Sequence, residues 1–423
     1  MTINRFLMML FGTLFNFILL FLLLCLNNIY MGGFMGIKLD FVKWFLLIFV
    51  ILHQLFILII LPNIKDMKAF CANILLSAVS LLLVLFVVEI ILHTADKSES
   101  NSTCSEIFHH SRIPNTSSIY SNFAEEYTIH YDINSRGFRD REYNLTKCAG
   151  CYRIIAVGDS FTDGMGVEEN DSFPKLLEAK LNKTEVINAG LPSNSAVLEY
   201  LEIKYNLTKL KPDMIMLNFD IGDVIQDMNY LKYGVFSGNE LIAVNGCQEK
   251  KSKPFEIKTI TLLNDVANKL IVVFKIEQKP ARITRIEDDT LRVIRYEYLN
   301  DTVVNQDWNV TLGYLLKINE LCKKNNITFV INTYAWALQI KPYDWKEGRL
   351  TFGFEVGKTY SLDPQNRIKR FCQENNITCL DLTPYFNEST AKNYYDYDMH
   401  WTKSGQKLAS EIIYSSLQTS QKQ

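Results

Sequence analysis

The chain has 423 residues, with 44 Lys and Arg against 46 Asp and Glu, and a formal net charge of −2. This length predicts two or three domains, and the near-neutral charge gives no indication of a nucleic-acid-binding protein. The apolar residues are concentrated near the N-terminus rather than spread evenly along the chain. Composition therefore points first to a membrane segment followed by a globular part.

Three long apolar stretches predict three transmembrane helices, over about residues 6–26, 44–61 and 70–92. At about 1.5 Å of rise per residue, each is long enough to cross a hydrocarbon core of about 30 Å. A cleaved signal peptide would account for the first stretch alone, and no small-residue cleavage site follows it. We therefore expect residues 1–94 to form a membrane domain held in the lipid bilayer.

The basic residues beside these spans favour, by a slight margin, an N-terminus on the cytoplasmic side. Arg5 precedes the first span, and Lys65 and Lys68 lie between the second and third, opposed by Lys38 and Lys43. With three spans, this orientation places everything after about residue 92 on the extracytoplasmic side, whether periplasmic, extracellular or lumenal.

Eleven Asn-x-Ser/Thr triplets follow Lys97, and each is a formal glycosylation acceptor because none has proline in the middle. They begin at Asn101, Asn115, Asn144, Asn170, Asn182, Asn206, Asn300, Asn309, Asn326, Asn376 and Asn387. They suit a glycoprotein whose globular part is lumenal or extracellular. A compositional bias toward Asn in a bacterial protein is the alternative, and the sequence leaves both open.

Seven of the nine cysteines lie outside the predicted spans, so at least one of the seven cannot belong to a pair among them. Cys148 and Cys151 have a spacing that also occurs in redox and metal sites. There is no second such pair and no neighbouring histidine, which favours a structural disulfide or plain thiols over zinc. We expect neither a metal nor a cofactor.

From residue 151 onward, strand-like and helix-like runs alternate. The strand-like runs are 153–157, 185–189, 214–221, 327–333 and 377–382, and the helix-like runs are 173–181, 196–210, 311–324, 363–373 and 403–417. This alternation predicts an α/β domain with a parallel sheet covered on both faces. The polar residues 95–150 read as a linker and lead-in segment, and residues 224–310, which lack the alternation, as an insertion or lid.

A serine follows the first of these strands directly. Ser160 lies in the stretch Gly-Asp-Ser-Phe-Thr-Asp-Gly over residues 158–164. Open α/β sheets place their sites at the carboxyl ends of the strands. The stretch differs from the Gly-x-Ser-x-Gly elbow of the α/β-hydrolases, and its residues are also ordinary turn residues. Ser160 is therefore a candidate nucleophile that requires a base.

The base must be a histidine near this serine in the fold, because a serine hydroxyl is unreactive at neutral pH. His400 stands just before the last helix-like run, whereas the other histidines lie in the spans or the lead-in segment. Asp398 can accept a hydrogen bond from one ring nitrogen while the other faces the serine. We expect Ser160, His400 and Asp398 to form a catalytic triad, with Asp396 as a less favoured partner of the histidine.

Together these motifs resemble those of the SGNH (GDSL-type) hydrolases. The Gly-Asp-Ser stretch resembles the family's opening block, and Asp-x-His-Trp-x-x-x-Gly at 398–405 resembles its closing block. Asn-x-x-Gly-Phe-Arg at 134–139 resembles the lead-in of membrane-anchored members. The resemblance covers roughly residues 130–420 and implies a three-layer α/β/α, flavodoxin-like hydrolase domain over residues 151–423.

The resemblance implies Ser160 as nucleophile, His400 as general base and then acid, and an oxyanion hole in which the Gly190 N–H joins that of Ser160. The family's third block carries Asn before Asp, whereas this chain has Gly222 before Asp223. Losing one oxyanion donor costs about 10²–10³ in rate, so the Gly222 amide or Asn194, after the Gly190 turn, would have to compensate. The expected supporting residues are Asp159, Asn194 and Asp223.

The function implied by the resemblance is that of a membrane-anchored serine ester hydrolase or O-acyltransferase. Its expected substrates are acyl esters of glycans or cell-surface polymers, cleaved through an acyl-enzyme. The departure at Gly222 leaves open a second reading, a catalytically weakened SGNH-fold binding or assembly protein. A transporter or channel subunit is disfavoured because the spans carry almost no polar groups. The sequence indicates no protein partner and no oligomeric state.

Overall fold

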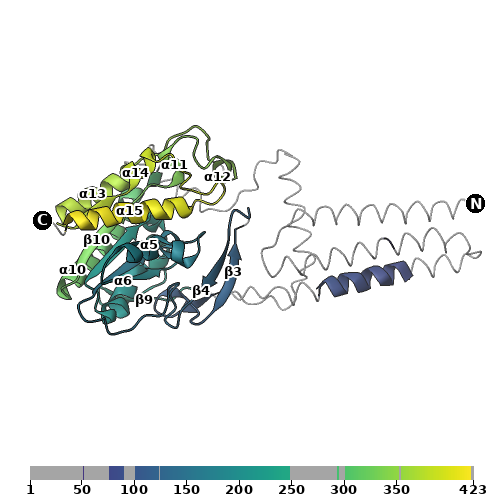
Figure 1. The fold of residues 1–423 in the computed structure, drawn as a ribbon, viewed down its shortest axis with the longest axis horizontal. Coiled ribbons are helices and arrows are strands. Elements are labelled where there is room, and N and C mark those ends of the chain that lie inside the picture. Colours follow the sequence, from purple (N-terminus) through teal and green to yellow (C-terminus); the bar gives the residue numbers. More distant parts are fainter. Residues whose placement is uncertain are drawn as a thin grey trace, which may run out of the picture. The chain divides into compact units, whose positions relative to one another are not determined.

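The structure, a computed structural model, describes residues 51, 76–89, 101–122, 124–247, 293–294, 301–351 and 354–420. The chain divides into two compact units, one of Met1–Glu99 with Lys251–Lys279 and one of Ser100–Lys250 with Pro280–Gln423. Figure 1 shows the elements of both units in ribbon form, coloured along the sequence.

In the first unit, residues 76–89 form a helix. Within the described ranges, no helix is both long enough and apolar enough to cross a membrane. The first predicted span and all of the second except Ile51 lie outside the described residues, and the third is described only in its middle. The transmembrane helices therefore stay a prediction.

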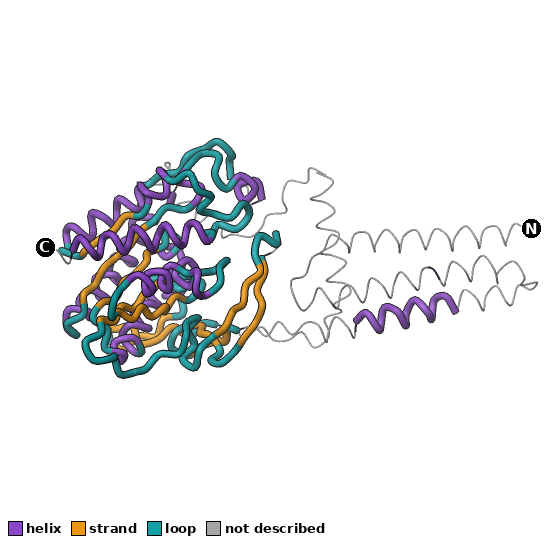
Figure 2. The backbone as a smooth tube through the Cα atoms, viewed as in Figure 1, coloured by secondary structure: helices purple, strands orange, loops and turns teal. Residues whose placement is uncertain are grey.

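The second unit is built on a five-stranded sheet with the order β11-β10-β7-β5-β6, in which every neighbouring pair is parallel. Figure 2 shows strands and helices of this unit in different colours. The strands are β5 (Tyr152–Gly158), β6 (Thr184–Gly190), β7 (Met214–Phe219), β10 (Thr328–Thr333) and β11 (Thr378–Asp381). Each lies within or within one residue of a predicted run, which confirms the parallel α/β class.

Helices connect the strands and cover the sheet. The main ones are α5 (Phe173–Lys180), α6 (Ala196–Tyr205), α10 (Thr302–Lys324), α13 (Asp363–Glu374) and α15 (Lys403–Ser420). Helix α5 packs against α15, whereas α10 packs against α6 (Figure 1). Because parallel crossovers are right-handed, the connection from β5 to β6 and the connections toward the opposite edge place their helices on opposite faces. The sheet is therefore sandwiched between two helix layers.

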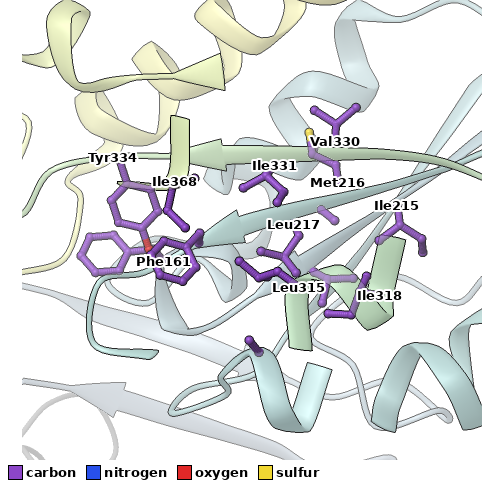
Figure 3. Packing of buried hydrophobic residues seen from close by; sticks show 14 of the residues in the cluster. Phe161, Ile215, Met216, Leu217, Leu315, Ile318, Val330, Ile331, Tyr334 and Ile368 are labelled. Carbon is purple, nitrogen blue, oxygen red and sulfur yellow. The ribbon is translucent and has the colours of Figure 1, made fainter. Parts of the chain in front are cut away.

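The shorter helices are α4 (Ser160–Asp163), α7 (Asp223–Leu231), α11 (Ala337–Ile340), α12 (Lys346–Thr351) and α14 (Thr383–Glu388), with 3-10 turns η2 (Glu169–Asp171) and η3 (Leu207–Leu210). All residues of the central strand β7 are buried, as expected for a strand covered on both faces. Figure 3 shows Leu217 of β7 and Ile331 of β10 packed near Leu315 of α10.

Three antiparallel hairpins complete the described fold: β1 (Ser102–Ser105) with β2 (His109–Arg112), β3 (Ser117–Ser121) with β4 (Thr128–Asp132), and β8 (Gly234–Ser237) with β9 (Glu240–Val244). The first two fall in the predicted linker and lead-in segment. The third falls, with α7, in the predicted insertion, and α10 begins earlier than predicted. Both segments thus contain helices or strands that the sequence did not indicate. Residues 248–292 of the insertion lie outside the described residues.

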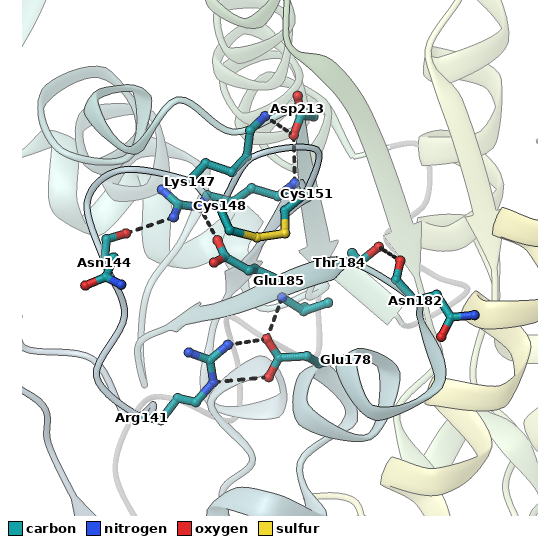
Figure 4. The surroundings of a disulfide bond; sticks show 12 residues. Arg141, Asn144, Lys147, Cys148, Cys151, Glu178, Asn182, Thr184, Glu185 and Asp213 are labelled. Atoms are coloured by element: carbon teal, nitrogen blue, oxygen red, sulfur yellow. Dashed lines mark hydrogen bonds and ion pairs between the residues drawn. A yellow bond between two sulfur atoms is a disulfide. The ribbon is translucent and has the colours of Figure 1, made fainter.

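Two disulfides join four of the cysteines beyond the predicted spans. Cys104–Cys247 links β1 to the residues after β9, and Cys148–Cys151 closes a turn before β5 (Figure 4). The second agrees with the predicted structural disulfide. The remaining cysteines of this group are free thiols, namely Cys322, Cys372 and Cys379.

Beside the Cys148–Cys151 turn, a buried arginine connects the groups at the amino-terminal ends of the parallel strands. Arg153, with no exposed surface, donates from Nε to Glu185 at 2.7 Å. Its other nitrogens donate to the carbonyls of Asn144, Leu145 and Leu210 at 2.7–2.9 Å. This guanidinium therefore satisfies two carbonyl groups of one loop, the carbonyl group at the end of η3 and one strand carboxylate at the same time.

We predict that Arg153→Met lowers the free energy of unfolding by about 3 kcal/mol, because it leaves buried acceptors without a donor. Arg141→Met is the matched control, since the ion pair of Arg141 with Glu178 involves a side chain that is 48% exposed. Its loss should cost less than about 1 kcal/mol. Urea unfolding of the two variants measures both values, and equal losses would contradict the assignment.

Candidate active site

The position of Ser160 follows from the strand order. Ser160 opens α4 directly after β5, and β5 has β6 on one side and β7 on the other. The connection from β5 runs toward one edge of the sheet, and the later connections run toward the other edge. Open α/β sheets bind ligands in the crevice at such a switch point. Asp159 caps α4 by accepting the Phe161 N–H at 2.9 Å. Gly158 allows the turn because a Cβ there would lie 2.2 Å from Thr162 Oγ1.

A chain of hydrogen bonds joins Ser160, His400 and Asp398. Ser160 Oγ lies 2.7 Å from His400 Nε2. His400 Nδ1 contacts Asp398 Oδ1, which also accepts the His400 backbone N–H at 3.0 Å. Because a carboxylate only accepts, Nδ1 carries the proton and Nε2 is left to accept from the serine. The structure thus brings together the three predicted residues, whereas Asp396 pairs with Lys392 at 2.7 Å.

Burial and charge set the protonation of this pair. Burial lowers the pKa of His400, but the hydrogen bond and charge of Asp398 outweigh it and raise the pKa above its ordinary 6.5. Burial raises the pKa of Asp398, but His400 and the Tyr127 hydroxyl lower it to about 2. Asp398 is therefore ionised at neutral pH, and His400 is a stronger base than a free imidazole.

An aromatic cluster packs against the imidazole through Phe161. The ring of Phe161 lies 5.0 Å from that of His400 and 5.1 Å from that of Trp401. Tyr334 packs 5.0 Å from Phe161 and 4.8 Å from Trp401, and Figure 3 shows the rings of Tyr334 and Phe161 next to each other. The contact with Phe161 restricts rotation of the histidine ring and so helps to keep it aligned between the serine and the carboxylate.

Both glycine amides that were predicted to form the oxyanion hole already have acceptors. The Gly190 N–H donates to Asn188 Oδ1 at 3.0 Å, and the Gly222 N–H donates to Asp220 Oδ1 at 2.7 Å. Only the Ser160 N–H remains as predicted, since the first N–H groups of a helix have no intrahelical acceptor. Lack of space explains why position 190 is a glycine, because a Cβ there would lie 2.2 Å from the backbone nitrogen of Asp163.

The predicted supporting residues have structural environments of their own. Asn194 is buried in the turn after β6, and in the described part of the chain no hydrogen bond joins its side chain to Ser160 or His400. Asn218, the nearest asparagine upstream of position 222 and not one of the predicted residues, lies inside the sheet, where it donates to the Val157 carbonyl at 3.1 Å. It therefore does not replace the asparagine missing at position 222.

Asp159 and Asp223 belong to a cluster of buried carboxyl groups beside the nucleophile turn, which the sequence did not reveal. Its members are Asp159, Glu199, Asp220, Asp223 and Asp227. Among the described residues, both oxygens of Glu199 and one of Asp223 have no hydrogen-bond partner. Burial raises the pKa of all five groups. Unpaired buried charges are costly, so Glu199 and Asp223, whose pKa values are raised furthest above the ordinary range, retain their protons at neutral pH.

The lead-in segment holds the nucleophile turn from the outside. Arg112 pairs with Asp163 at 2.6 Å, and Tyr131 donates to the same carboxylate at 2.5 Å. Arg139 donates to the carbonyls of Asp163 and Gly164 at 3.2 and 2.8 Å. Arg139 is the last residue of the Asn-x-x-Gly-Phe-Arg stretch. The sequence therefore singled out this arginine, but it did not indicate that its side chain binds the nucleophile turn.

The lead-in histidines lie elsewhere. His110 contacts the Pro192 carbonyl at 3.0 Å and neighbours His109. His130 pairs with Glu168 on the surface, with a side chain that is 70% exposed. Within the described ranges, none of the three bonds to Ser160.

No protein-family model matches the chain, and no curated protein matches it. Solved structures do match. A GDSL-like lipase from Bacteroides thetaiotaomicron is 12% identical, with 63% of this chain and 88% of that chain covered and a TM-score of 0.34. A member of the lipolytic G-D-S-L family from Veillonella parvula is 12% identical, with 63% and 97% covered and a TM-score of 0.34. A catalytic mutant of an acetylxylan esterase from Geobacillus stearothermophilus is 11% identical, with 64% and 95% covered and a TM-score of 0.34. At these values the similarity alone assigns neither a family nor an activity to this chain.

We predict that Asp159→Asn reduces the dependence of stability on pH. Burial and the nearby Asp220 carboxyl raise the pKa of Asp159 from 3.8 to about 8. The folded protein therefore keeps a proton that the unfolded chain loses, and this contribution to stability disappears as pH rises from about 4 to about 8. The variant lacks this titration, yet its amide oxygen can still accept the Phe161 N–H.

The test is urea unfolding of both proteins between pH 5 and pH 8. The free energy of unfolding should fall more steeply with pH in the unsubstituted protein than in the variant. Parallel curves would contradict the raised pKa.

Proposed function

We propose that the chain is a membrane-anchored, extracytoplasmic serine ester hydrolase of the SGNH type. The observation that carries the proposal is the hydrogen-bond chain Ser160–His400–Asp398 at the switch point of the sheet. It provides a nucleophile, a neutral base aimed at it and a carboxylate that fixes the base. This arrangement is the triad by which a serine hydroxyl becomes reactive at neutral pH.

In the first half of the reaction, Ser160 Oγ attacks the ester carbonyl carbon while its proton passes to His400 Nε2. Asp398 stabilises the imidazolium that forms. The Ser160 N–H donates to the developing oxyanion. When the tetrahedral intermediate collapses, the bond to the alcohol oxygen breaks, and His400 returns the proton to that oxygen. The products of this step are the free alcohol and an acyl group on Ser160.

In the second half, a water molecule takes the place of the alcohol. His400 accepts a proton from the water, the hydroxide adds to the acyl carbon, and Ser160 leaves with the proton from His400. His400 and Asp398 are 22% and 15% exposed, which is compatible with water reaching the base. A sugar hydroxyl in the position of this water would turn the same step into acyl transfer.

Acyl esters of glycans or cell-surface polymers are the substrates we propose. Support comes from the sequence motifs and from the predicted extracytoplasmic placement, where such polymers are found. Short acyl esters such as 4-nitrophenyl acetate are suitable probes, because the triad acts on the ester carbonyl itself.

We predict that the full-length protein hydrolyses 4-nitrophenyl acetate and that Ser160→Ala and His400→Ala each lower kcat by at least about 10³-fold. His130→Ala is the matched control, since this histidine lies on the surface away from Ser160. Circular dichroism of each variant checks folding. Turnover that survives in folded Ser160→Ala would exclude this serine as nucleophile.

The pH dependence gives an independent prediction. Catalysis needs neutral His400, so kcat/KM should rise with pH through a pKa above 6.5. Asp398→Asn removes the carboxylate that raises this pKa and leaves the burial that lowers it. The acid limb should therefore move to lower pH, and kcat should fall by about 10³–10⁴-fold. A limb at the unchanged pH would show that Asp398 does not control the base.

The engaged amides of Gly190 and Gly222 favour one other candidate, a catalytically weakened binding or assembly protein of the same fold. With fewer oxyanion donors, the triad would support slow turnover or none. Gly222→Asn, which would restore the family's asparagine, is a poor test of this candidate. A Cβ at position 222 would lie 2.8 Å from Asp220 Oδ1, so the substitution would also displace Asp220. The turnover measurement described above separates the two candidates, because the ester hydrolase requires Ser160-dependent turnover and the binding or assembly protein does not.

A further inference from the structure

The loop between β3 and β4 reaches the segment that carries Asp398. The Glu126 carboxylate accepts three consecutive backbone N–H groups of that segment: from Asp396 at 2.5 Å, Tyr397 at 3.1 Å and Asp398 at 2.9 Å. Charge-assisted hydrogen bonds of this kind are about twice as strong as neutral ones. A single side chain of the lead-in segment therefore fixes the backbone on the amino-terminal side of His400.

Glu126 is itself held in place. Asn122 Nδ2 donates to Glu126 Oε2 at 3.0 Å, and the Glu126 N–H donates to Asn122 Oδ1 at 2.8 Å. This reciprocal pair orients the carboxylate before it meets the N–H groups. The anchor is thus preorganised within its own loop.

The next residue contacts the Asp398 side chain. Tyr127 is buried, and its hydroxyl donates to Asp398 Oδ2 at 2.6 Å. The other oxygen of Asp398 is occupied by His400. The ring of Tyr127 packs 4.9 Å from that of Tyr395. Both carboxylate oxygens are therefore engaged, one by the base and one by this tyrosine.

Asp398 needs such an anchor because its own segment has little regular structure. Residues 395–400 belong to neither a helix nor a strand. A carboxylate on a loop can turn away from its histidine unless other groups fix it, and a loss of alignment of about 1 Å can cost about 10²-fold in rate.

We propose that Glu126 and Tyr127 are positioning residues that hold Asp398 against His400, an inference that rests on the proposed function. Glu126 fixes the backbone of the segment, and Tyr127 fixes the plane of the carboxylate. The lead-in segment is then part of the catalytic apparatus, although it lies outside the parallel sheet. Among the described residues, neither side chain has a hydrogen bond to Ser160 or to the His400 ring.

The test compares kcat and KM for 4-nitrophenyl acetate in the full-length protein, Tyr127→Phe, Asp398→Asn and the double variant. Tyr143→Phe is the matched control, since its hydroxyl is buried in the same segment and has no hydrogen-bond partner among the described residues. Tyr127→Phe should lower kcat about tenfold with KM within about twofold, and Tyr143→Phe should change neither. Because Tyr127 acts through Asp398, Tyr127→Phe should lower kcat less than about twofold in the Asp398→Asn background.

A Tyr127→Phe protein with the kcat of Tyr143→Phe would overturn the proposal, as would a full tenfold loss in the Asp398→Asn background. In both cases the unsubstituted protein still shows Ser160-dependent turnover, so the proposed function stands. Absence of that turnover in the unsubstituted protein would instead refute the function, and the positioning role with it.

Glu126→Gln provides a second measurement that does not depend on turnover. Its amide presents an N–H₂ group where a carboxylate oxygen accepted, so the backbone N–H groups of residues 396–398 should exchange with solvent at least about tenfold faster. The thermal unfolding midpoint shows whether the variant is folded. Unchanged exchange in a folded variant would remove Glu126 from the proposal.

Discussion

The hydrogen bond between Ser160 and His400 is the contact on which the rest of the arrangement depends, because it joins side chains 240 residues apart. The sheet supplies one partner at the carboxyl end of β5. The other stands immediately before α15, which returns to pack against α5 next to the same strands. The packing of α15 against α5 brings the two side chains together. The same packing stabilises the domain, so the geometry of the site and the stability of the domain are linked.

Polar contacts from the lead-in segment secure both sides of that hydrogen bond. Arg112 and Tyr131 hold Asp163 at the end of the nucleophile helix. Glu126 and Tyr127 hold the segment of Asp398. In the proposed account, this segment aligns the two halves of the triad, so damage to it would reduce catalysis without touching a reacting atom.

Much of the fold was predictable because the signals are local. The apolar strands and their helices follow from periodicity, and Ser160, His400 and Asp398 follow from two short motifs. The acceptors of the two glycine amides, Asn188 and Asp220, lie only two residues before their glycines, but the backbone conformation that brings each pair together is not visible in the sequence. The contact of Tyr127 with Asp398 could not be predicted, because it spans 271 residues and leaves no periodic pattern.

The central claim is that Ser160 is an activated nucleophile, and labelling with a fluorophosphonate followed by peptide mass spectrometry tests it most directly. The account predicts one adduct, on the Ser160 hydroxyl, that forms quickly in the full-length protein and is lost in Ser160→Ala and His400→Ala. A folded protein that forms no adduct, or forms it equally well without His400, would contradict the account.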